Sequence, residues 1–159
     1  RAGGEFRLVA LQEIAAGERI FLIEGEKTHR PTRHSVQIGE NLHIDLRPGR
    51  SLEEELDRYF WRYMNHGCEP TAMVDGRDVV ALRDLRPFED ITIDYNATEY
   101  DMAEPFACRC GSKRCHGTVR GFRHLTRAEQ ERLRPSLADH LLRHLDAPPP
   151  ATEAFPVPA

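Results

Sequence analysis

The sequence has 159 residues, of which 40% are hydrophobic and 30% are charged, and its formal net charge is −4 at pH 7. That length suits one domain with a single core, and no apolar run is long enough to cross a membrane. The negative charge argues against general binding to nucleic-acid phosphates. It is compatible with a basic peptide substrate, but so small a net charge is also usual for a protein that merely needs to be soluble. The sequence begins with Arg1 rather than Met, which suggests a fragment or a processed chain.

The amino-terminal third of the chain predicts short strands and one helix. Strands are expected at residues 6–14, 19–24 and 41–46, where apolar and β-branched residues alternate with polar ones. Residues 27–39 have weak periodicity and predict a loop. A capping-box pattern at residues 51–54 then starts a helix, in which Leu, Tyr and Phe recur at helical spacing up to residue 63.

The middle of the chain predicts a hairpin and a last strand. Residues 71–74 and 79–83 flank Asp75-Gly76, a dipeptide typical of tight hairpin turns. Residues 91–95 predict the final strand. These short strands by themselves indicate a mainly β domain.

The carboxyl-terminal part predicts helices and a tail. A second capping box begins at Thr126, and Pro135 is expected to divide the following stretch into two helices. Their apolar face would carry Leu133, Leu137, Leu141 and Leu145. The tail, 147–159, is rich in Pro and Ala and is expected to be extended or disordered.

The four cysteines of the chain suit a single zinc ion. Cys108, Cys110 and Cys115 are close in sequence, and Cys68 lies far upstream, so the fourth ligand requires the fold to join the two segments. Four thiolates in a tetrahedron form a closed structural zinc site. Two disulfides are the alternative, with three possible connectivities, but neighbours in a Cys-x-Cys pattern are poorly placed to bond. His116 is a further alternative ligand.

Three segments in order resemble the SET-domain protein-lysine methyltransferases that carry a post-SET zinc motif. Residues 65–71 (Asn-His-Gly-Cys-Glu-Pro-Thr) resemble the family's Asn-His-Ser-Cys-x-Pro-Asn signature, and residues 91–95 (Ile-Thr-Ile-Asp-Tyr) resemble its strand ending in Asp-Tyr. Residues 108–117 match the post-SET pattern Cys-x-Cys-Gly-x-x-x-Cys-x-Gly. With weaker similarity upstream, the resemblance covers about residues 7–122.

The resemblance implies a SET-type β-clip fold with a knot-like crossing of two segments. It implies a SET domain at 1–107, a post-SET zinc motif at 108–122, a helical extension at 123–146 and the tail at 147–159. The zinc would be structural, held by Cys68, Cys108, Cys110 and Cys115, and would fold the post-SET segment over the cofactor.

The resemblance also implies methyl transfer from S-adenosylmethionine to a protein lysine, with Tyr95 as the catalytic residue. The cofactor would be contacted by Arg62, Tyr63, Asn65, His66 and Tyr95. The lysine channel would be lined by Ile93, Tyr100 and Phe106. Ile93 lies two residues before the tyrosine and has no hydroxyl to anchor a water, which implies a capacity for di- or trimethylation.

Each of these residues also has a purely structural interpretation. Tyr95 and Ile93 suit a half-buried strand, and Asn65-His66 suits a turn. Arg62 could be a solvated cation at a helix end, and the three aromatic residues Tyr63, Tyr100 and Phe106 are as well explained by core packing.

Three departures from the family pattern stand out. The Gly-x-Gly usual before the first strand is absent, because its positions hold Glu5 and Arg7. Gly67 and Thr71 replace a serine and an asparagine, and Phe88 stands where a turn glycine is usual. The missing glycines favour an alternative function, a catalytically inactive SET-like module that binds a peptide or protein partner. In either case we expect a monomer that does not bind membranes or nucleic acid. We expect it inside the cell, in a bacterial cytoplasm or in a eukaryotic nucleus or cytoplasm.

Overall fold

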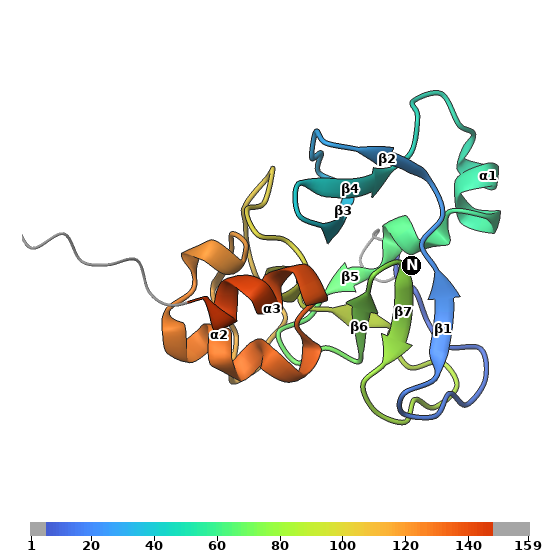
Figure 1. Ribbon diagram of the computed structural model, residues 1–159. Coiled ribbons are helices and arrows are strands. Elements are labelled where there is room, and N and C mark those ends of the chain that lie inside the picture. Colours follow the sequence, from blue (N-terminus) through green and yellow to red (C-terminus); the bar gives the residue numbers. More distant parts are fainter. Residues whose placement is uncertain (1–5, 148–159) are drawn as a thin grey trace, which may run out of the picture.

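The computed structural model describes residues 6–147, which form short strands followed by small carboxyl-terminal helices (Figure 1). The strands are β1 (Arg19–Leu22), β2 (Glu26–Thr28), β3 (Val36–Gly39), β4 (Leu42–Asp45), β5 (Asn65–His66), β6 (Ala72–Asp75), β7 (Asp78–Ala81), β8 (Thr92–Ile93), β9 (Phe106–Ala107) and β10 (Thr118–Val119). The α-helices are α1 (Leu52–Asp57), α2 (Arg127–Leu133) and α3 (Asp139–Asp146), and the 3₁₀ turns are η1 (Phe60–Tyr63), η2 (Tyr95–Ala97), η3 (Phe122–His124) and η4 (Arg134–Ser136).

The strands pair in four small sheets. Two have three strands, in the orders β1-β7-β6 and β2-β4-β3, and two are the pairs β10-β9 and β5-β8. The β5-β8 pair is parallel, and each of the others is antiparallel. The mainly β class expected from the sequence is confirmed.

The β6-β7 hairpin follows directly from its sequence. Asp75 pairs with Asp78 across a two-residue turn, and Gly76 adopts φ +58, a conformation that suits glycine. On one face, Ala72 and Val74 pair with Ala81 and Val79, and all four are buried. Because side chains alternate between the two faces of both strands, one face of the hairpin packs against the main core.

Three strand predictions need correction. Residues 27–39 were expected to be a loop, but β3 and most of β2 lie within it, because both strands bond to the edges of β4. Residues 6–14 were expected to be a strand, but in the described part they make only isolated bridges at Val9 and Ile14. The strand at 91–95 ends at Ile93, because the Asp94 side chain accepts the Asn96 N–H and caps η2.

The predicted helices form, but the first is shorter than expected. Ser51 caps α1 through the Glu54 N–H, whereas the helix ends at Asp57 and residues 60–63 form η1 instead. At η1, Trp61 is buried and its Nε1–H donates to the Glu24 carbonyl at 2.9 Å, which fits the packing role expected of it.

The carboxyl-terminal helices form a second core. The capping box at Thr126 is present, and η4 at Pro135 separates α2 from α3 as expected. Leu133, Leu137, Leu141 and Leu145 are buried together with Ala97 and Phe122. In Figure 1, α2 and α3 lie at the opposite end of the molecule from α1.

The remaining sequence predictions concern strands after Tyr95, a membrane-spanning helix and the tail. The chain pairs again after Tyr95, in β9 and β10, although no strand was expected there. No helix between residues 6 and 147 is long and apolar enough to cross a bilayer. The predicted tail at 147–159 lies outside the described residues except for Ala147.

A turn residue offers a test of backbone strain. Phe88 has φ +67 and is 74% exposed, at the position where the family pattern has glycine. Replacing it with glycine removes the steric conflict of the Cβ, so we expect Phe88→Gly to raise the free energy of unfolding by about 1 kcal/mol. Urea denaturation measures it. Phe88→Ala is the control, because it removes the ring but keeps the Cβ; an equal gain in both variants would contradict the strain explanation.

Candidate active site and metal centre

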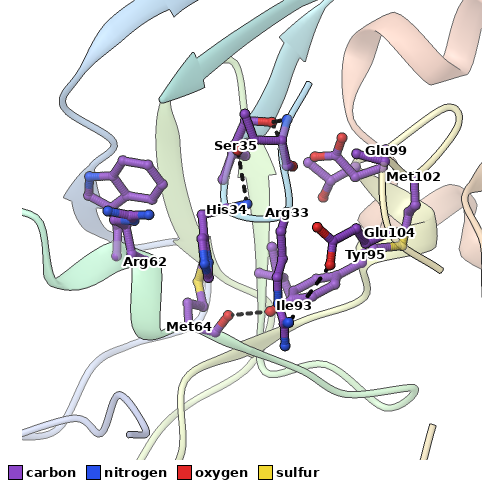
Figure 2. Close-up of a pocket in the computed structure, with 15 residues that line it drawn as sticks. Arg33, His34, Ser35, Arg62, Met64, Ile93, Tyr95, Glu99, Met102 and Glu104 are labelled. Atoms are coloured by element: carbon purple, nitrogen blue, oxygen red, sulfur yellow. Dashed lines mark hydrogen bonds and ion pairs between the residues drawn. The ribbon is translucent and has the colours of Figure 1, made fainter. Parts of the chain in front are cut away.

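A small, partly open pocket is lined by Tyr95. Its volume is about 70 Å³. The lining comes from the β2-β3 turn, η1, β8 and the segment after η2 (Figure 2): Thr32, Arg33, His34, Ser35, Val36, Trp61, Arg62, Met64, Ile93, Tyr95, Thr98, Glu99, Met102, Ala103 and Glu104. Segments distant in sequence therefore meet at this one tyrosine.

The hydroxyl of Tyr95 is held in a fixed direction. It donates a hydrogen bond of 2.7 Å to the Met64 carbonyl, as Figure 2 shows. Burial raises the pKa of Tyr95 to about 12, and the nearby Glu99 carboxylate acts in the same direction. The phenol is therefore protonated at neutral pH, and its oxygen keeps lone pairs that can accept a further hydrogen bond.

A second, more open groove is lined by the other residue of β8. Ile93 lines the Tyr95 pocket, whereas its neighbour Thr92 lines the groove, as successive strand residues point to opposite faces. The groove has a volume of about 570 Å³. It is lined by residues 6–8, 65–69, 90–92 and 110–112.

The predicted site residues divide between these two spaces. Asn65 and His66 line the groove, and Ile93 lines the pocket. Arg62, expected at the cofactor, instead lines the Tyr95 pocket and pairs with Glu55 at 2.9 Å.

The remaining predicted aromatic residues lie at the edges of the site or away from it. Tyr63 stacks on Phe6 with ring centroids 4.7 Å apart, next to the groove. Phe106 lies with its ring centroid 6.0 Å from that of Tyr95. Tyr100 does not line the pocket, and its ring centroid lies 4.4 Å from that of His144 on α3.

Sequence reasoning missed the charged residues of the pocket. Arg33 and Glu104 form an ion pair of 3.7 Å there, and Figure 2 shows it beside Tyr95. Glu99 is buried, accepts the Gln37 N–H at 2.8 Å and lies 3.5 Å from His43 Nε2. None of these residues stands in a motif: Arg33 precedes β3, and Glu99 and Glu104 come from the segment between η2 and β9.

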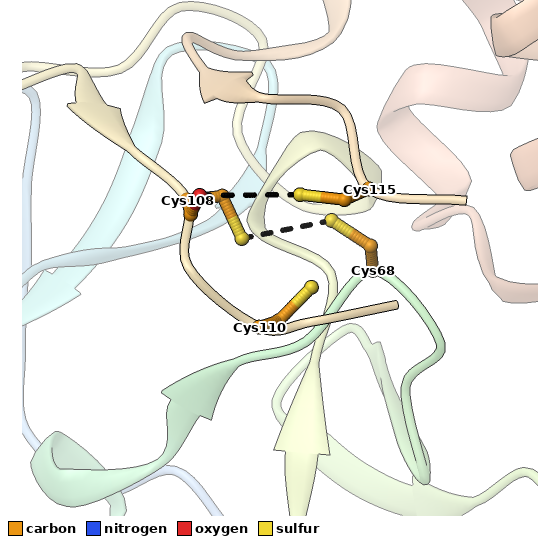
Figure 3. A group of neighbouring side chains, drawn as sticks. All are labelled: Cys68, Cys108, Cys110 and Cys115. Carbon is orange, nitrogen blue, oxygen red and sulfur yellow. Dashed lines mark hydrogen bonds between the residues drawn. The ribbon is translucent and has the colours of Figure 1, made fainter. Parts of the chain in front are cut away.

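The four cysteines form one cluster, as predicted (Figure 3). Their sulfur atoms all lie within 4.8 Å of one another, and all four thiols are free, which rules against the disulfide alternative in this structure. A tetrahedron with Zn–S bonds of about 2.3 Å has edges of about 3.8 Å. The Sγ atoms of Cys68 and Cys108 are 3.8 Å apart, so the cluster fits a zinc ion.

Backbone donors support the cluster as a thiolate site. The His116 N–H donates to Cys68 Sγ and the Gly117 N–H donates to Cys115 Sγ, both at 3.4 Å. The side chain of His116 points elsewhere, with Nε2 3.1 Å from Asp94. The cysteine set, without His116, therefore has the geometry to hold a metal ion.

His66 lies between the cysteine cluster and Tyr95. Its Nδ1 accepts the Tyr95 N–H at 3.2 Å, so the ring proton belongs on Nε2, which lies 3.1 Å from Cys68 Sγ. Burial lowers the pKa of His66, so the ring is neutral at neutral pH. This histidine thus links a predicted metal ligand to the backbone of the predicted catalytic residue.

The departures from the family pattern have local explanations. A Cβ on Gly67 would lie 3.0 Å from Thr92 Oγ1, which leaves little room for the usual serine. The Thr71 hydroxyl donates to the Asp90 carbonyl and accepts the Thr92 N–H, both at 2.9 Å. Arg7 lines the groove and pairs with Asp90 at 3.1 Å, and Glu5 lies outside the described residues.

Comparisons with known proteins agree with this geometry. The family described as SET domain matches residues 5–96. The chain belongs to the SET-domain family. It is 30% identical over 131 residues to the "Histone-lysine N-methyltransferase, H3 lysine-36 specific" of Yarrowia lipolytica, covering 73% of this chain and 17% of that protein.

Two further comparisons extend the result. The chain is 32% identical to "Methyltransferase flvH" of Aspergillus flavus, covering 78% of this chain and 67% of that protein. It also resembles the crystal structure of KRYPTONITE in complex with mCHG DNA and SAH, with a TM-score of 0.54, 19% identity, and coverage of 75% of this chain and 27% of that one. That structural likeness confirms the SET-type fold.

The cysteine cluster generates a metal prediction. We expect one zinc per purified chain, and Cys68→Ser is expected to lose most of it and to lower the melting temperature, because three thiolates hold the ion less tightly. Elemental analysis and thermal denaturation measure both effects. Ser112→Ala is the control, since it changes the same loop without removing a thiol. Full zinc retention and unchanged stability in Cys68→Ser would remove Cys68 from the site.

Proposed function

We propose that this chain transfers a methyl group from S-adenosylmethionine to a lysine side chain of a protein substrate. The observation that carries the proposal is the Tyr95 hydroxyl, which is fixed on the Met64 carbonyl at a pocket lined by Ile93, while the neighbouring residue Thr92 lines a more open groove. The names of the relatives support the reaction, since they include histone-lysine N-methyltransferases. The chain spans only 17% of the Yarrowia lipolytica relative. We therefore infer the class of substrate from the geometry of the site and not from the name of that protein.

The groove suits the cofactor. Its volume lies in the range usual for small-molecule sites, and its lining combines Phe6 and Leu8 with Asn65, Arg7 and Asp90. Asn65 and His66 would hold the cofactor there, next to the loop at 110–112. When bound, S-adenosylmethionine supplies the methyl group and a positive sulfonium. The KRYPTONITE structure, which is a complex with SAH, supports this choice.

The residues of the pocket would prepare the amine. A free lysine has a pKa of about 10.4, and the apolar part of the pocket wall, Trp61, Met64 and Ile93, disfavours its charged form. The positive sulfonium would act in the same direction, whereas the Glu99 and Glu104 carboxylates of the same pocket act against it. The Tyr95 oxygen would accept a hydrogen bond from the neutral amine and so direct its lone pair along the transfer line. Alignment of this kind supplies much of the rate in a displacement reaction.

The second candidate function is a catalytically inactive module that binds a peptide. Only the absent Gly-x-Gly favours it, whereas Tyr95, Asn65, His66 and the cysteine cluster are all in place. Titration calorimetry with S-adenosylmethionine distinguishes the two, because the inactive module needs no cofactor. A monomeric, intracellular protein that does not bind nucleic acid stays our expectation, as do the SET and post-SET boundaries at residues 107 and 108.

The hydroxyl of Tyr95 provides the first test of the reaction. We expect Tyr95→Phe to lower kcat by at least about a hundredfold, because the hydroxyl acts in the transition state, while KM and cofactor binding change little. Methyl transfer from labelled S-adenosylmethionine to an array of lysine peptides measures it. Tyr59→Phe is the matched control, since Tyr59 is buried and lies outside both cavities. Near-normal turnover in Tyr95→Phe would contradict the assignment.

Ile93 provides a test of how many methyl groups are added. Its side chain is buried in the pocket wall and offers no hydroxyl that could bind a water or restrain the amine. We therefore expect the wild type to produce di- or trimethyl-lysine and Ile93→Tyr to stop mainly at one methyl group. Mass spectrometry of the product after long incubation measures the number of methyl groups added, and Ile93→Val is the control. A wild type that stops at one methyl group, with Ile93→Tyr behaving identically, would refute the size argument.

A further inference from the structure

The carboxylate next to Tyr95 is completely buried and has no role in the proposed reaction. The side chain of Asp94 is 0% exposed, and its Oδ1 accepts the Asn96 N–H at 2.9 Å. Its Oδ2 lies 3.1 Å from Nε2 of His116, whose side chain is 6% exposed. A buried carboxylate is costly unless it is paired, so this contact has a structural reason to persist.

His116 belongs to the loop that carries three of the four cysteines. It directly follows Cys115, and its own N–H donates to Cys68 Sγ at 3.4 Å. The same loop forms one wall of the open groove through Cys110, Gly111 and Ser112. The position of this loop therefore determines the shape of the groove opposite Asn65 and His66.

We infer that His116 is a positioning residue, which docks the cysteine loop onto the Tyr95 segment through its hydrogen bond to Asp94. A metal at the cysteine cluster would join the loop to the rest of the domain at Cys68, because the other three cysteines belong to the loop itself. The ends of the loop pair with each other in β9 and β10, and just beyond β10 the Arg120 and Gly121 N–H groups donate to Asn96 Oδ1. Within the loop, the contact between His116 and Asp94 is a side-chain attachment to the Tyr95 segment, and it adds to these anchors in fixing the orientation of the groove wall.

The pair also connects the loop to the reacting end of the domain. Asp94 directly precedes Tyr95, and its Oδ1 lies 3.6 Å from His66 Nδ1, the atom that accepts the Tyr95 N–H. The side chains of His116, Asp94 and His66 and the backbone of Tyr95 thus form one connected set of contacts. Loss of the His116 side chain should loosen the loop without removing any metal ligand.

Three variants test the inference. His116→Ala removes the contact, and His116→Gln keeps an N–H donor that can reach the carboxylate. His124→Ala is the matched control, since His124 pairs with Asp101 at 2.8 Å on the surface, where that carboxylate is 47% exposed. Each protein is purified with its metal, and three quantities are measured: zinc content, amide hydrogen exchange of residues 106–119, and the affinity for S-adenosylhomocysteine by calorimetry.

We expect His116→Ala to keep its zinc, to exchange the amides of 106–119 at least about tenfold faster, and to bind S-adenosylhomocysteine several-fold more weakly. His116→Gln should restore most of the wild-type exchange rate and of the wild-type affinity. His124→Ala should match the wild type in both. Wild-type exchange in His116→Ala would overturn the inference. Loss of zinc in both His116 variants would also overturn it, because His116 would then act on the metal site itself.

A second variant covers a folding failure. If His116→Ala does not fold, His116→Leu fills the same space without the hydrogen bond, and wild-type exchange in that protein overturns the inference. The affinity measurement rests on the proposed function, whereas the exchange measurement does not. A wild type that fails to bind S-adenosylhomocysteine would therefore count against the proposed function, while the exchange data still decide the role of His116.

Discussion

The parallel pairing of β5 with β8 is the constraint on which the rest of the site depends. It places Asn65 opposite Thr92 and His66 opposite Ile93, so that two segments from different parts of the chain run side by side. Once they are paired, the Tyr95 hydroxyl reaches the Met64 carbonyl and the Tyr95 N–H reaches His66. The alternation of side chains along β8 then puts Ile93 in the wall of the pocket and Thr92 in the wall of the groove.

The cysteine cluster extends this constraint to the carboxyl-terminal half. Cys68 lies two residues after β5, and the other three cysteines reach it from the loop between β9 and β10. The cysteine cluster and the groove therefore share a wall, since Cys68 and Cys110 belong to both. The chain after this loop adds a separate core, which joins the site through the hydrogen bond from the Ala138 N–H to the Ala97 carbonyl.

Sequence reasoning succeeded where local chemistry or a specific motif constrains the outcome. The cysteine set was predicted because zinc demands four ligands, and the β6-β7 hairpin because of its Asp-Gly turn. It failed at β2 and β3, since these short edge strands carry little pattern of their own and form only by pairing with β4. Tyr100, expected in the lysine channel, contacts His144 on α3 instead of lining the pocket, and no local pattern indicates that contact.

The same contrast separates the two faces of the site. The groove is lined largely by residues from the two motifs at 65–71 and 108–117, so its chemistry is readable from sequence. The Tyr95 pocket takes Arg33 and His34 from the turn before β3, and Glu104 from the irregular segment before β9. These residues would meet a substrate rather than the cofactor, and no motif constrains them. Selectivity for the substrate would therefore reside in the part of the chain with the weakest local signal, where the ion pair between Arg33 and Glu104 already places opposite charges beside the incoming side chain.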